Sequence, residues 1–431
     1  MKQYESYKDS GVQWWGKVPN HWELCKAKNM FSLITDNVSD SSLPKVALEN
    51  IESGTGRFVQ TEGVFMGEGV EFSVDDILFG KLRPYLAKVY KAEFNGQSVG
   101  DIYVFRGKDN QVPDFLKYVL LSYPFISVVD GSTYGAKMPR ANWDFISHMV
   151  LPCPSQEEQH FIASYLNYKV GQIDAAIAEK EQMLEDLKAF RSAIISEAVT
   201  KGLEKNVEMK DSGIETIGMM PLHWRVKRLK FVSDNFDGTH FSPEIKEDGM
   251  PYITAADVRG KGIDYTSAKK ISQEDYNRLV EQRCKIEKYD VLLVKDGATT
   301  GRVGFMTDTT DCVALSSVAM LRPKENIFPL FLMYSMMSDS MQTQIINSMA
   351  GSAMPRITLT KLNEFVVCVP PLNEQRVIAL SIDSCVERVE ITLAEIQSQI
   401  SDLKSYKSSL ITEAVTGKMD LRGWDHRRVN T

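Results

Sequence analysis

The chain lacks every short motif by which the common catalytic sites are recognised in a sequence. It has no G-x-x-x-x-G-K-[ST] loop for nucleotide phosphates, no G-x-G-x-x-G between a strand and a helix, no H-E-x-x-H and no G-x-S-x-G. It also has no Asp-Pro-Pro-Tyr or Asn-Pro-Pro-Tyr sequence of the kind that amino-methyltransferases use. These absences argue against an enzyme with a familiar active site.

Signals of membrane insertion, secretion and metal binding are missing as well. No apolar run reaches about 18 residues, and residues 1–9 are too polar for a signal peptide. The 6 cysteines show no C-x-x-C spacing, and such scattered thiols are typical of a reducing compartment. We therefore expect a cytoplasmic globular protein of two or three domains, with no membrane contact and no metal site.

A net positive charge, the usual mark of a nucleic-acid-binding domain, is not present. The formal net charge is -7, and residues 155–208 hold 10 acidic against 6 basic side chains. Residues 210–370 hold 20 of each sign. Any surface that binds nucleic acid must therefore be a local patch, which counts modestly against such a function.

What the chain does contain is an internal repeat. A Lys-Asp-Ser-Gly sequence followed by Pro-x-His-Trp opens both copies, at residues 8–22 and 210–224, an offset of 202. A Glu-Gln pair and a later [Ser/Thr]-Glu-Ala-Val-Thr sequence close both copies, at residues 158–200 and 374–416, an offset of 216. The additional residues of the second copy lie between these blocks, where the copies match least. In each copy the repeated segments flank a central core, and we call these flanking segments the frame. Two dissimilar cores within two similar frames indicate a protein that carries two different recognition modules.

A long helix is predicted in the closing part of each copy. Residues 155–201 contain no proline, and apolar residues recur there at alternating steps of four and three, a pattern that returns at an offset of 216. This spacing is typical of a coiled coil, and a helix of that length measures about 70 Å. The alternative is that each helix packs separately on its own domain. The seam positions are Leu166, Val170, Ile173, Ile177, Leu184 and Leu187, then Ile382, Val386, Val389, Leu393, Ile400 and Leu403.

The sequence also marks the ends of these helices. Ser155 and Asn373 are candidate N-caps, and Gly202 and Gly417 suit the left-handed residue that follows a helix. By the duplication, the N-terminal residues lead into the first core as residues 211–221 lead into the second. The N-terminus should then lie near the end of the second helix, which predicts a circular arrangement with a pseudo-twofold axis.

Each core, at about residues 18–150 and 220–366, is expected to be an α+β globule. Apolar runs of strand length occupy residues 77–79, 102–105, 291–294 and 313–315, and helices are expected at residues 115–121 and 330–336. His21 and His223 recur in the two Pro-x-His-Trp turns, so a packing role is favoured over catalysis for them.

Basic and small residues recur at two loops of each core. Lys81 follows Asp76-Ile-Leu, Lys295 follows Asp290-Val-Leu, and glycine-containing loops at residues 131–140 and 351–356 end the cores. Glycine lets a loop approach a surface closely, and lysine or arginine suits phosphates or guanine edges. A solvated turn is the alternative for any one residue. The candidate DNA-binding residues are Lys81, Arg83, Tyr85, Lys137, Arg140, Lys295, Arg302, Ser352 and Arg356.

The combination of these motifs resembles the specificity subunit of type I restriction–modification systems. The resemblance is carried by residues 351–359, 369–375, 412–418 and 421–424, by the Pro-x-His-Trp turns and by the two-copy layout, and it covers essentially the whole chain. It implies an α+β fold with two globular target recognition domains joined by two long antiparallel coiled-coil helices. Each recognition domain would read one half of a bipartite DNA sequence, and the helix pair would set the spacing.

The resemblance also implies a division of the chain and a set of partners. The implied parts are an N-terminal segment at 1–17 near the second helix, target recognition domain 1 at 18–150, the central conserved helix at 151–203, the segment leading into repeat 2 at 204–219, target recognition domain 2 at 220–366, the C-terminal conserved helix at 367–418 and a tail at 419–431. The expected partners are double-stranded DNA, two methylation subunits and restriction subunits. No cofactor is expected in this chain, since S-adenosylmethionine, ATP and Mg would bind the partner subunits.

Two other readings of the sequence stay open at this point. One is an enzyme, a methyltransferase or nuclease whose site carries no familiar motif. The other is an assembly scaffold whose cores bind protein instead of DNA.

Overall fold

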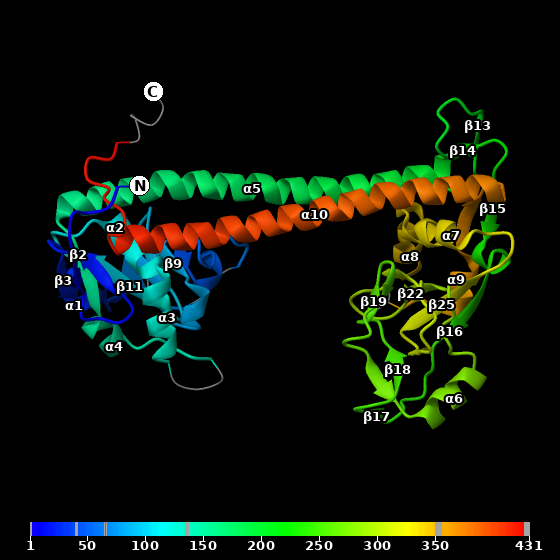
Figure 1. The fold of residues 1–431 in the computed structure, drawn as a ribbon, viewed down its shortest axis with the longest axis horizontal. Helices are drawn as coiled ribbons and strands as arrows, with labels where there is room; N and C mark the ends of the chain where they lie inside the picture. The colour runs from blue at the N-terminus through cyan, green and yellow to red at the C-terminus, as the bar shows by residue number, and fades with distance from the viewer. Residues whose placement is uncertain are drawn as a thin grey trace. The chain divides into compact units, whose positions relative to one another are not determined.

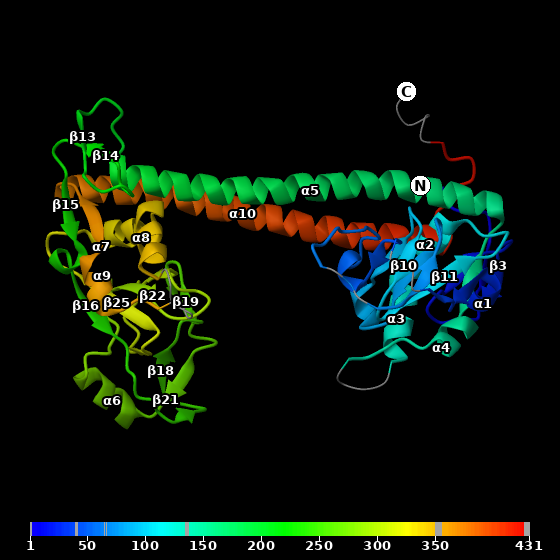
Figure 2. The same cartoon turned by 180° about the vertical axis from the view of Figure 1, so that it is seen from behind.

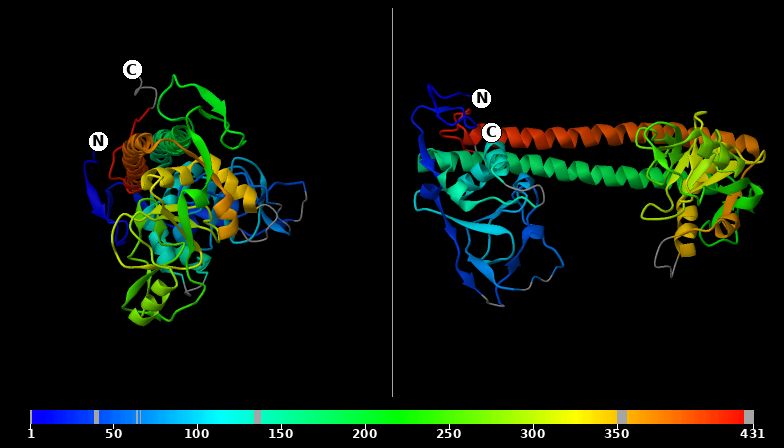
Figure 3. Two further views of the ribbon diagram at one scale, coloured as in Figure 1. Left: turned by 90° about the vertical axis from the view of Figure 1, so that its right-hand side faces the viewer. Right: turned by 90° about the horizontal axis from the view of Figure 1, so that it is seen from below.

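The computed structural model describes residues 2–38, 42–63, 65, 67–133, 138–349 and 356–425. The chain divides into two compact units, unit 1 with Met1–Glu181 and Gln397–Thr431, and unit 2 with Gln182–Ile396. Each unit contains an α+β core and a part of each of two long helices, α5 (Gln156–Lys201) and α10 (Leu372–Val415) (Figure 1). Within each unit these two helices lie side by side, as Figure 3 shows from other directions.

The ends of the long helices follow local sequence chemistry, with one exception. Ser155 is confirmed as the cap of α5, because its hydroxyl accepts the Glu158 N–H at 3.3 Å. Asn373 is the wrong cap for α10, which begins at Leu372 directly after Pro371, whose carbonyl accepts the Gln375 N–H at 3.0 Å. Gly202 and Gly417 adopt the predicted left-handed conformation, with φ of +81° and +70°.

Unit 1 is built on two small sheets covered by short helices. The first sheet has the order β4 (Phe31–Ile34), β11 (Ile102–Gly107), β8 (Ile77–Gly80) and β9 (Val89–Lys91), all antiparallel. The second has the order β5 (Asn37–Val38), β7 (Gly69–Phe72), β10 (Gly96–Ser98) and β6 (Lys45–Val46). The helices are α1 (Ala27–Met30), α2 (Pro113–Leu121), α3 (Tyr123–Gly131) and α4 (Trp143–His148).

Unit 2 repeats this plan with an enlarged second layer. Its first sheet has the order β16 (Ser233–Asp237), β25 (Val318–Pro323), β22 (Val291–Val294) and β23 (Val303–Phe305). Its second has the order β17 (Ile245–Lys246), β21 (Lys269–Ile271), β18 (Met250–Ile253) and β24 (Val313–Ala314), near α6 (Gln273–Glu281) (Figure 2). The remaining elements are the hairpin β19 (Val258–Arg259) and β20 (Gly262–Ile263), and helices α7 (Pro329–Met337), α8 (Asp339–Met349) and α9 (Leu359–Glu364).

Two-stranded ribbons connect each core to its frame. In unit 1 they pair β1 (Tyr7–Asp9) with β2 (Lys17–Pro19) and β3 (Glu23–Lys26) with β12 (Val150–Cys153). In unit 2 they pair β13 (Met209–Asp211) with β14 (Met219–Pro221) and β15 (Arg225–Arg228) with β26 (Val366–Val369). The predicted strands and core helices are confirmed in β8, β11, β22, α2 and α7, and in β24 except for Leu315, which lies one residue beyond that strand.

The offset between the copies grows along the core. From the start of β4 to the start of β16 the numbering advances by 202, as it does at the opening motifs. From β8 to β22 it advances by 214, and from β11 to β25 by 216. Most of the additional chain therefore falls between β16 and β22. There unit 2 carries α6, so the extra chain enlarges one layer of the core and leaves the first sheet unchanged.

The N-terminal segment packs against the chain that follows α10, as the duplication predicts. The Asp420 N–H donates to the Lys2 carbonyl at 2.9 Å, and the Arg422 guanidinium lies 4.9 Å from the centre of the Tyr4 ring. Gly417 sits against Pro19, and a Cβ at that position would collide with the proline ring. Among the described residues, no helix combines the length and the hydropathy needed to cross a bilayer.

Candidate nucleic-acid interface

The repeated Glu-Gln pair fixes each core to its long helix. In unit 1 the buried Glu158 carboxylate accepts the Trp22 indole N–H at 3.3 Å and the Tyr4 hydroxyl at 3.1 Å, and it lies 2.9 Å from His21 Nε2. Burial, followed by the Glu158 charge, raises the pKa of Tyr4. The packing role predicted for His21 is therefore confirmed.

Unit 2 makes the same contacts with the matching residues. Glu374 accepts the Trp224 indole N–H at 3.0 Å and lies 2.9 Å from His223 Nε2. The neighbouring glutamines also act alike. Gln159 accepts the Val112 N–H at 2.9 Å, and Gln375 accepts the Phe328 N–H at 2.7 Å, so both amides hold the start of a core helix. The frame of each unit is thus a hydrogen-bonded joint and not only an apolar contact.

A second joint links the core helices to the long helices. The Tyr118 hydroxyl donates to Asn167 at 2.9 Å in unit 1, and the Tyr334 hydroxyl donates to Asp383 at 2.7 Å in unit 2. Both residues of the second pair match those of the first at the offset of 216. Burial, with the Asp383 carboxylate, raises the pKa of Tyr334.

The aspartate of each Asp-[Ile/Val]-Leu motif is a buried carboxylate paired with a partly exposed arginine, a contact that the sequence did not predict. Asp76 receives the Arg106 guanidinium at 2.8 and 2.6 Å, and Asp290 receives that of Arg322 at 3.0 and 2.9 Å. The carboxylates are almost inaccessible, at 3% and 0% exposure of the side chain. The signal in the sequence was the recurrence of an arginine at an offset of 216. These pairs place the aspartates in the core and not on a DNA-binding surface.

In unit 1 the structure brings together the predicted basic residues that follow β8 and precede α4. Leu82 and Arg140 form an antiparallel bridge, and the Arg83 N–H donates to the Pro139 carbonyl at 2.8 Å. The Arg140 guanidinium donates to the Asp101 carboxylate at 3.1 and 3.0 Å, and the Lys81 ammonium lies 3.8 Å from the same carboxylate. Two loops that are distant in the chain thus form one polar surface.

Arg83 and Tyr85 lie at the exposed edge of that surface. Arg83 has a positive φ of 52°, which is uncommon for a residue with a side chain and turns the loop away from β8. Both side chains are exposed, and within the described part of the chain no side-chain partner holds the Arg83 guanidinium. Lys137, also predicted here, lies outside the described residues.

Unit 2 has the same pair of loops with a different set of charges. Asp296 and Arg356 form the matching bridge, and Arg356 Nε lies 3.4 Å from Asp296 Oδ1. Lys295, the counterpart of Lys81, is 2% exposed, and its ammonium lies 2.8 Å from Asp237. In this structure the Lys295 ammonium is buried and neutralises Asp237. Its direct contact with DNA stays a prediction. Ser352 lies outside the described residues.

The carboxylate that pairs with the basic residues comes from different positions in the two loop pairs. In unit 1 it is Asp101, whose match at the offset of 216 is Ser317. Unit 2 instead places Asp296 within the bridge and Asp237 under the lysine. The two loop pairs share a backbone bridge but present different charged side chains.

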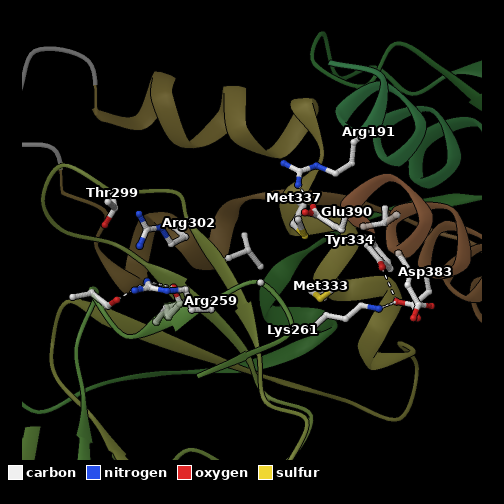
Figure 4. Close-up of a pocket in the computed structure, with 16 residues that line it drawn as sticks. Arg191, Arg259, Lys261, Thr299, Arg302, Met333, Tyr334, Met337, Asp383 and Glu390 are labelled. Carbon is white, nitrogen blue, oxygen red and sulfur yellow. Dashed lines mark hydrogen bonds and ion pairs between the residues drawn. The ribbon is translucent and has the colours of Figure 1, made fainter. Parts of the chain in front are cut away.

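Arg302 faces a cavity of about 1270 Å³ in unit 2. The cavity lies between the β19–β20 hairpin, α7 and the long helices, with Met333, Met337 and Val386 among its apolar residues. Figure 4 shows the Lys261 ammonium paired with Asp383, which also receives the Tyr334 hydroxyl. The basic residues on its wall are Arg191, Arg259, Lys261 and Arg302.

Most of the predicted seam residues on the long helices are buried. Leu166, Val170, Ile173 and Ile177 of α5 are buried in unit 1, together with Ile400 of α10. In unit 2, Leu184, Ile382, Val386 and Val389 are buried. Leu187, Leu393 and Leu403 are only half-buried. The described residues contain no cluster of three or more histidine, cysteine or acidic side chains with the geometry to hold a metal ion.

Comparisons with known proteins point to one family along the whole chain. Residues 221–401 match the family model described as the type I restriction modification DNA specificity domain. The specificity subunit of the type I restriction enzyme EcoBI from Escherichia coli is 25% identical over 366 residues, covering 82% of this chain and 75% of that protein. The MjaVIII specificity subunit from Methanocaldococcus jannaschii is 22% identical over 431 residues, covering 94% and 95%.

Solved structures share the fold. A chain from a study of complex assembly and conformational transition in the type I R-M system superposes with a TM-score of 0.72 at 16% identity, over 93% of this chain and 99% of that one. The HsdS subunit from Thermoanaerobacter tengcongensis gives a TM-score of 0.50 at 16% identity, over 95% and 100%. These likenesses confirm the mixed helix and sheet content and the two long helices.

Proposed function

We propose that this chain is a member of the family of type I restriction–modification specificity subunits, the non-catalytic DNA-recognition components of those systems, and that each of its cores reads one half of a bipartite DNA sequence. The observation that carries the proposal is the repeat of the frame around two unlike cores. Glu158 and Glu374 make the same joint in the two units, whereas the loop pairs at Arg140 and Arg356 carry different charges.

The proposed domains follow from that repeat. Target recognition domain 1 spans residues 18–150 and target recognition domain 2 spans residues 220–366. The proposed DNA contacts are made by the exposed residues of the matched loops, with Arg83 and Arg140 in the first domain and Arg302 and Arg356 in the second. The Tyr85 ring and the Lys81 ammonium, at the edge of the first surface, are also proposed to contact DNA. Lys137 and Ser352 are included on the basis of their positions in the sequence alone.

We further propose that the two domains are joined by an antiparallel coiled coil in a circular, pseudo-twofold arrangement, and that this coil sets the spacing of the half-sites. Two contacts support it, each within one unit. Lys180 donates to Gln399 at 2.6 Å in unit 1, and Arg191 pairs with Glu390 in unit 2. Within unit 1, Asp174 also faces Lys407 and Glu181 faces Lys404, so an advance along α5 corresponds to a step back along α10. A stiff helix pair makes the spacing a geometric quantity, at about 1.5 Å per residue.

The proposed partners are double-stranded DNA, two methylation subunits and restriction subunits. S-adenosylmethionine, ATP and Mg are proposed to bind those subunits and not this chain. The outer faces of the long helices in unit 2 expose apolar side chains, among them Phe190 of α5 and Val377, Leu380 and Ile391 of α10. Exposed apolar side chains that recur on one helix face are typical of a protein-binding surface, so we place methylation-subunit docking there.

The test is co-expression with the cognate methylation subunit, followed by single-molecule sequencing of methylated adenines in the host DNA. The proposal expects one bipartite motif with a fixed gap. A stable complex that methylates no motif would overturn it and favour an assembly scaffold. Methylation by the isolated chain would instead support the enzyme reading.

A docking variant gives an independent check. Val377→Glu with Leu380→Glu should prevent co-purification of the methylation subunit, because two charges would have to be buried in the interface. Glu387→Lys on the same helix is a matched control, since that side chain faces the unit 2 cavity. Normal binding by the double variant would place the docking surface elsewhere.

A further inference from the structure

We propose that a cation–carboxylate pair inside the helix seam fixes the register of the two long helices, and that the pair in unit 1, Lys407 with Asp174, determines how strictly the half-site spacing is kept. The inference rests on the proposed function, because it assigns spacing to named residues of the helix pair.

The pair is part of the repeat and not an isolated contact. Lys407 and Arg191 interrupt the apolar seam at matched positions with an offset of 216, and the same offset relates their partners Asp174 and Glu390. In unit 1 the Lys407 ammonium lies 2.9 and 3.2 Å from the two Asp174 carboxylate oxygens. In unit 2 the Arg191 guanidinium pairs with Glu390. The same cross-helix geometry is therefore built twice, once in each unit.

The two ion pairs differ in how deeply they are buried. The Lys407 and Asp174 side chains are 6% and 14% exposed, whereas those of Arg191 and Glu390 are 32% and 51% exposed. A polar pair enclosed in an apolar seam disfavours every shifted register, since a shift would bury two unpaired charges. An exposed pair imposes a much smaller penalty, because water solvates the separated ions. The buried pair in unit 1 is thus the stronger determinant of register.

The unit 1 pair also connects the helices to the recognition core. The Thr55 carbonyl lies 3.5 Å from the Lys407 ammonium, and an Arg57 guanidinium nitrogen lies 3.3 Å from Asp174. Both residues belong to a loop whose ends are joined by a bridge between Ile51 and Phe58. Axial movement of either helix would therefore break contacts with the core as well as the helix–helix pair.

Other polar contacts along the seam do not provide the same constraint. Lys404 and Glu181 approach to 3.4 Å but are both more than half exposed. Lys180 and Gln399 form an exposed hydrogen bond. In unit 2 the facing hairpin sends Lys261 to Asp383 and leaves Arg191 and Glu390 on the wall of the large cavity. Among the described residues, only the Lys407 pair joins α5, α10 and a core loop at one point.

The experiment replaces both charges by apolar side chains of similar size, Lys407→Met with Asp174→Leu. Replacement of a whole buried pair often leaves stability unchanged or raised, whereas removal of one partner leaves an unpaired charge. The matched control is Arg191→Met with Glu390→Leu in unit 2. Each variant is assembled with the methylation subunit and given plasmids in which the two half-sites are separated by shorter, preferred and longer spacers.

The inference expects the Lys407–Asp174 double variant to keep its thermal midpoint and its half-sites, while its preference for one spacer falls by about tenfold. The single substitution Lys407→Arg, which keeps a cation opposite Asp174, should retain the wild-type spacer preference. The unit 2 control should change that preference far less. An unchanged spacer preference in the unit 1 double variant would overturn the inference, and so would failure of that variant to fold, since the pair would then serve stability. Failure of the wild-type complex to methylate any bipartite motif would count against the proposed function instead.

Discussion

Unit 1 and unit 2 hold their cores in the same way but differ in what those cores present. The joints at Glu158 and Glu374 use the same residue types, and the tyrosines that reach the long helices are matched at the offset of 216. The loop pairs at Arg140 and Arg356 share a backbone bridge, yet Asp101 has no acidic counterpart at that offset. The comparison teaches that the joints to the long helices are conserved between the units, whereas the charged partners of the two loop arginines differ.

The comparison also shows how a joint can be modified without being lost. Asn167 of unit 1 becomes Asp383 in unit 2, and both accept the hydroxyl of a core tyrosine. The added charge pairs with Lys261 of the β19–β20 hairpin. A single exchange on the long helix thus adds an ion pair between that helix and the core of unit 2.

The largest effect is expected from removing the core arginines. Arg322→Ala would leave Asp290 buried without its cation, and we expect a loss of about 3–5 kcal/mol in the free energy of unfolding. Arg106→Ala should cost a similar amount in the other core, because Asp76 is as deeply buried. Urea unfolding of both variants measures this. A loss of less than about 1 kcal/mol in either one would break the equivalence of the two cores.

A smaller, unequal effect is expected at the two joints. Glu158→Gln removes the charge from a buried carboxylate that binds Tyr4 in addition to the repeated histidine and tryptophan, whereas Glu374 is more exposed. We expect the unit 1 variant to lose about 2 kcal/mol and the unit 2 variant about 1 kcal/mol. The same unfolding experiment distinguishes them, and a reversed order would show that exposure does not govern the strength of this joint.

The recognition loops should respond one at a time. Arg140→Ala should weaken discrimination in one half of the DNA motif and Arg356→Ala in the other, each by about 1–3 kcal/mol if the guanidinium contacts a base. Methylation of plasmids with single substitutions in each half-site measures this. Equal weakening at all positions of both halves would assign the two arginines to phosphate contacts.

The smallest effect concerns the thiols of unit 2. Burial raises the pKa of Cys312 and of Cys368 to about 12, so both stay protonated and unreactive at neutral pH in the folded protein. Because the unfolded thiols ionise at lower pH, these two groups should destabilise the fold progressively as the pH rises above about 8.5. Among the unit 2 thiols, maleimide at neutral pH should modify the half-buried Cys385 first. Rapid labelling of Cys368 would show that the β26 region opens readily.

Much of the frame could be predicted from the sequence because it is built from local signals. The periodicity of α5, the Ser155 cap and the left-handed Gly202 and Gly417 are all readable within a few residues. The start of α10 was placed wrongly because Asn373 is a better side-chain cap than Pro371, while the helix starts from the carbonyl of the proline.

Long-range pairing could not be predicted in the same way. The burial of Lys295 depends on Asp237, which is distant in the sequence and lies on β16. The Arg106–Asp76 pair joins the start of β8 to β11, and only the finished sheet brings the two side chains together. The offset of 216 predicted which residues are equivalent, but not what each of them contacts.

The central claim is that the two cores read DNA independently on a common frame. Its most direct test replaces residues 220–366 with the matching core of another specificity subunit, followed by sequencing of methylated adenines in the host. The account predicts that one half of the bipartite motif changes while the other half and the gap are retained. A change in both halves, or a change in the gap with both halves retained, would contradict it.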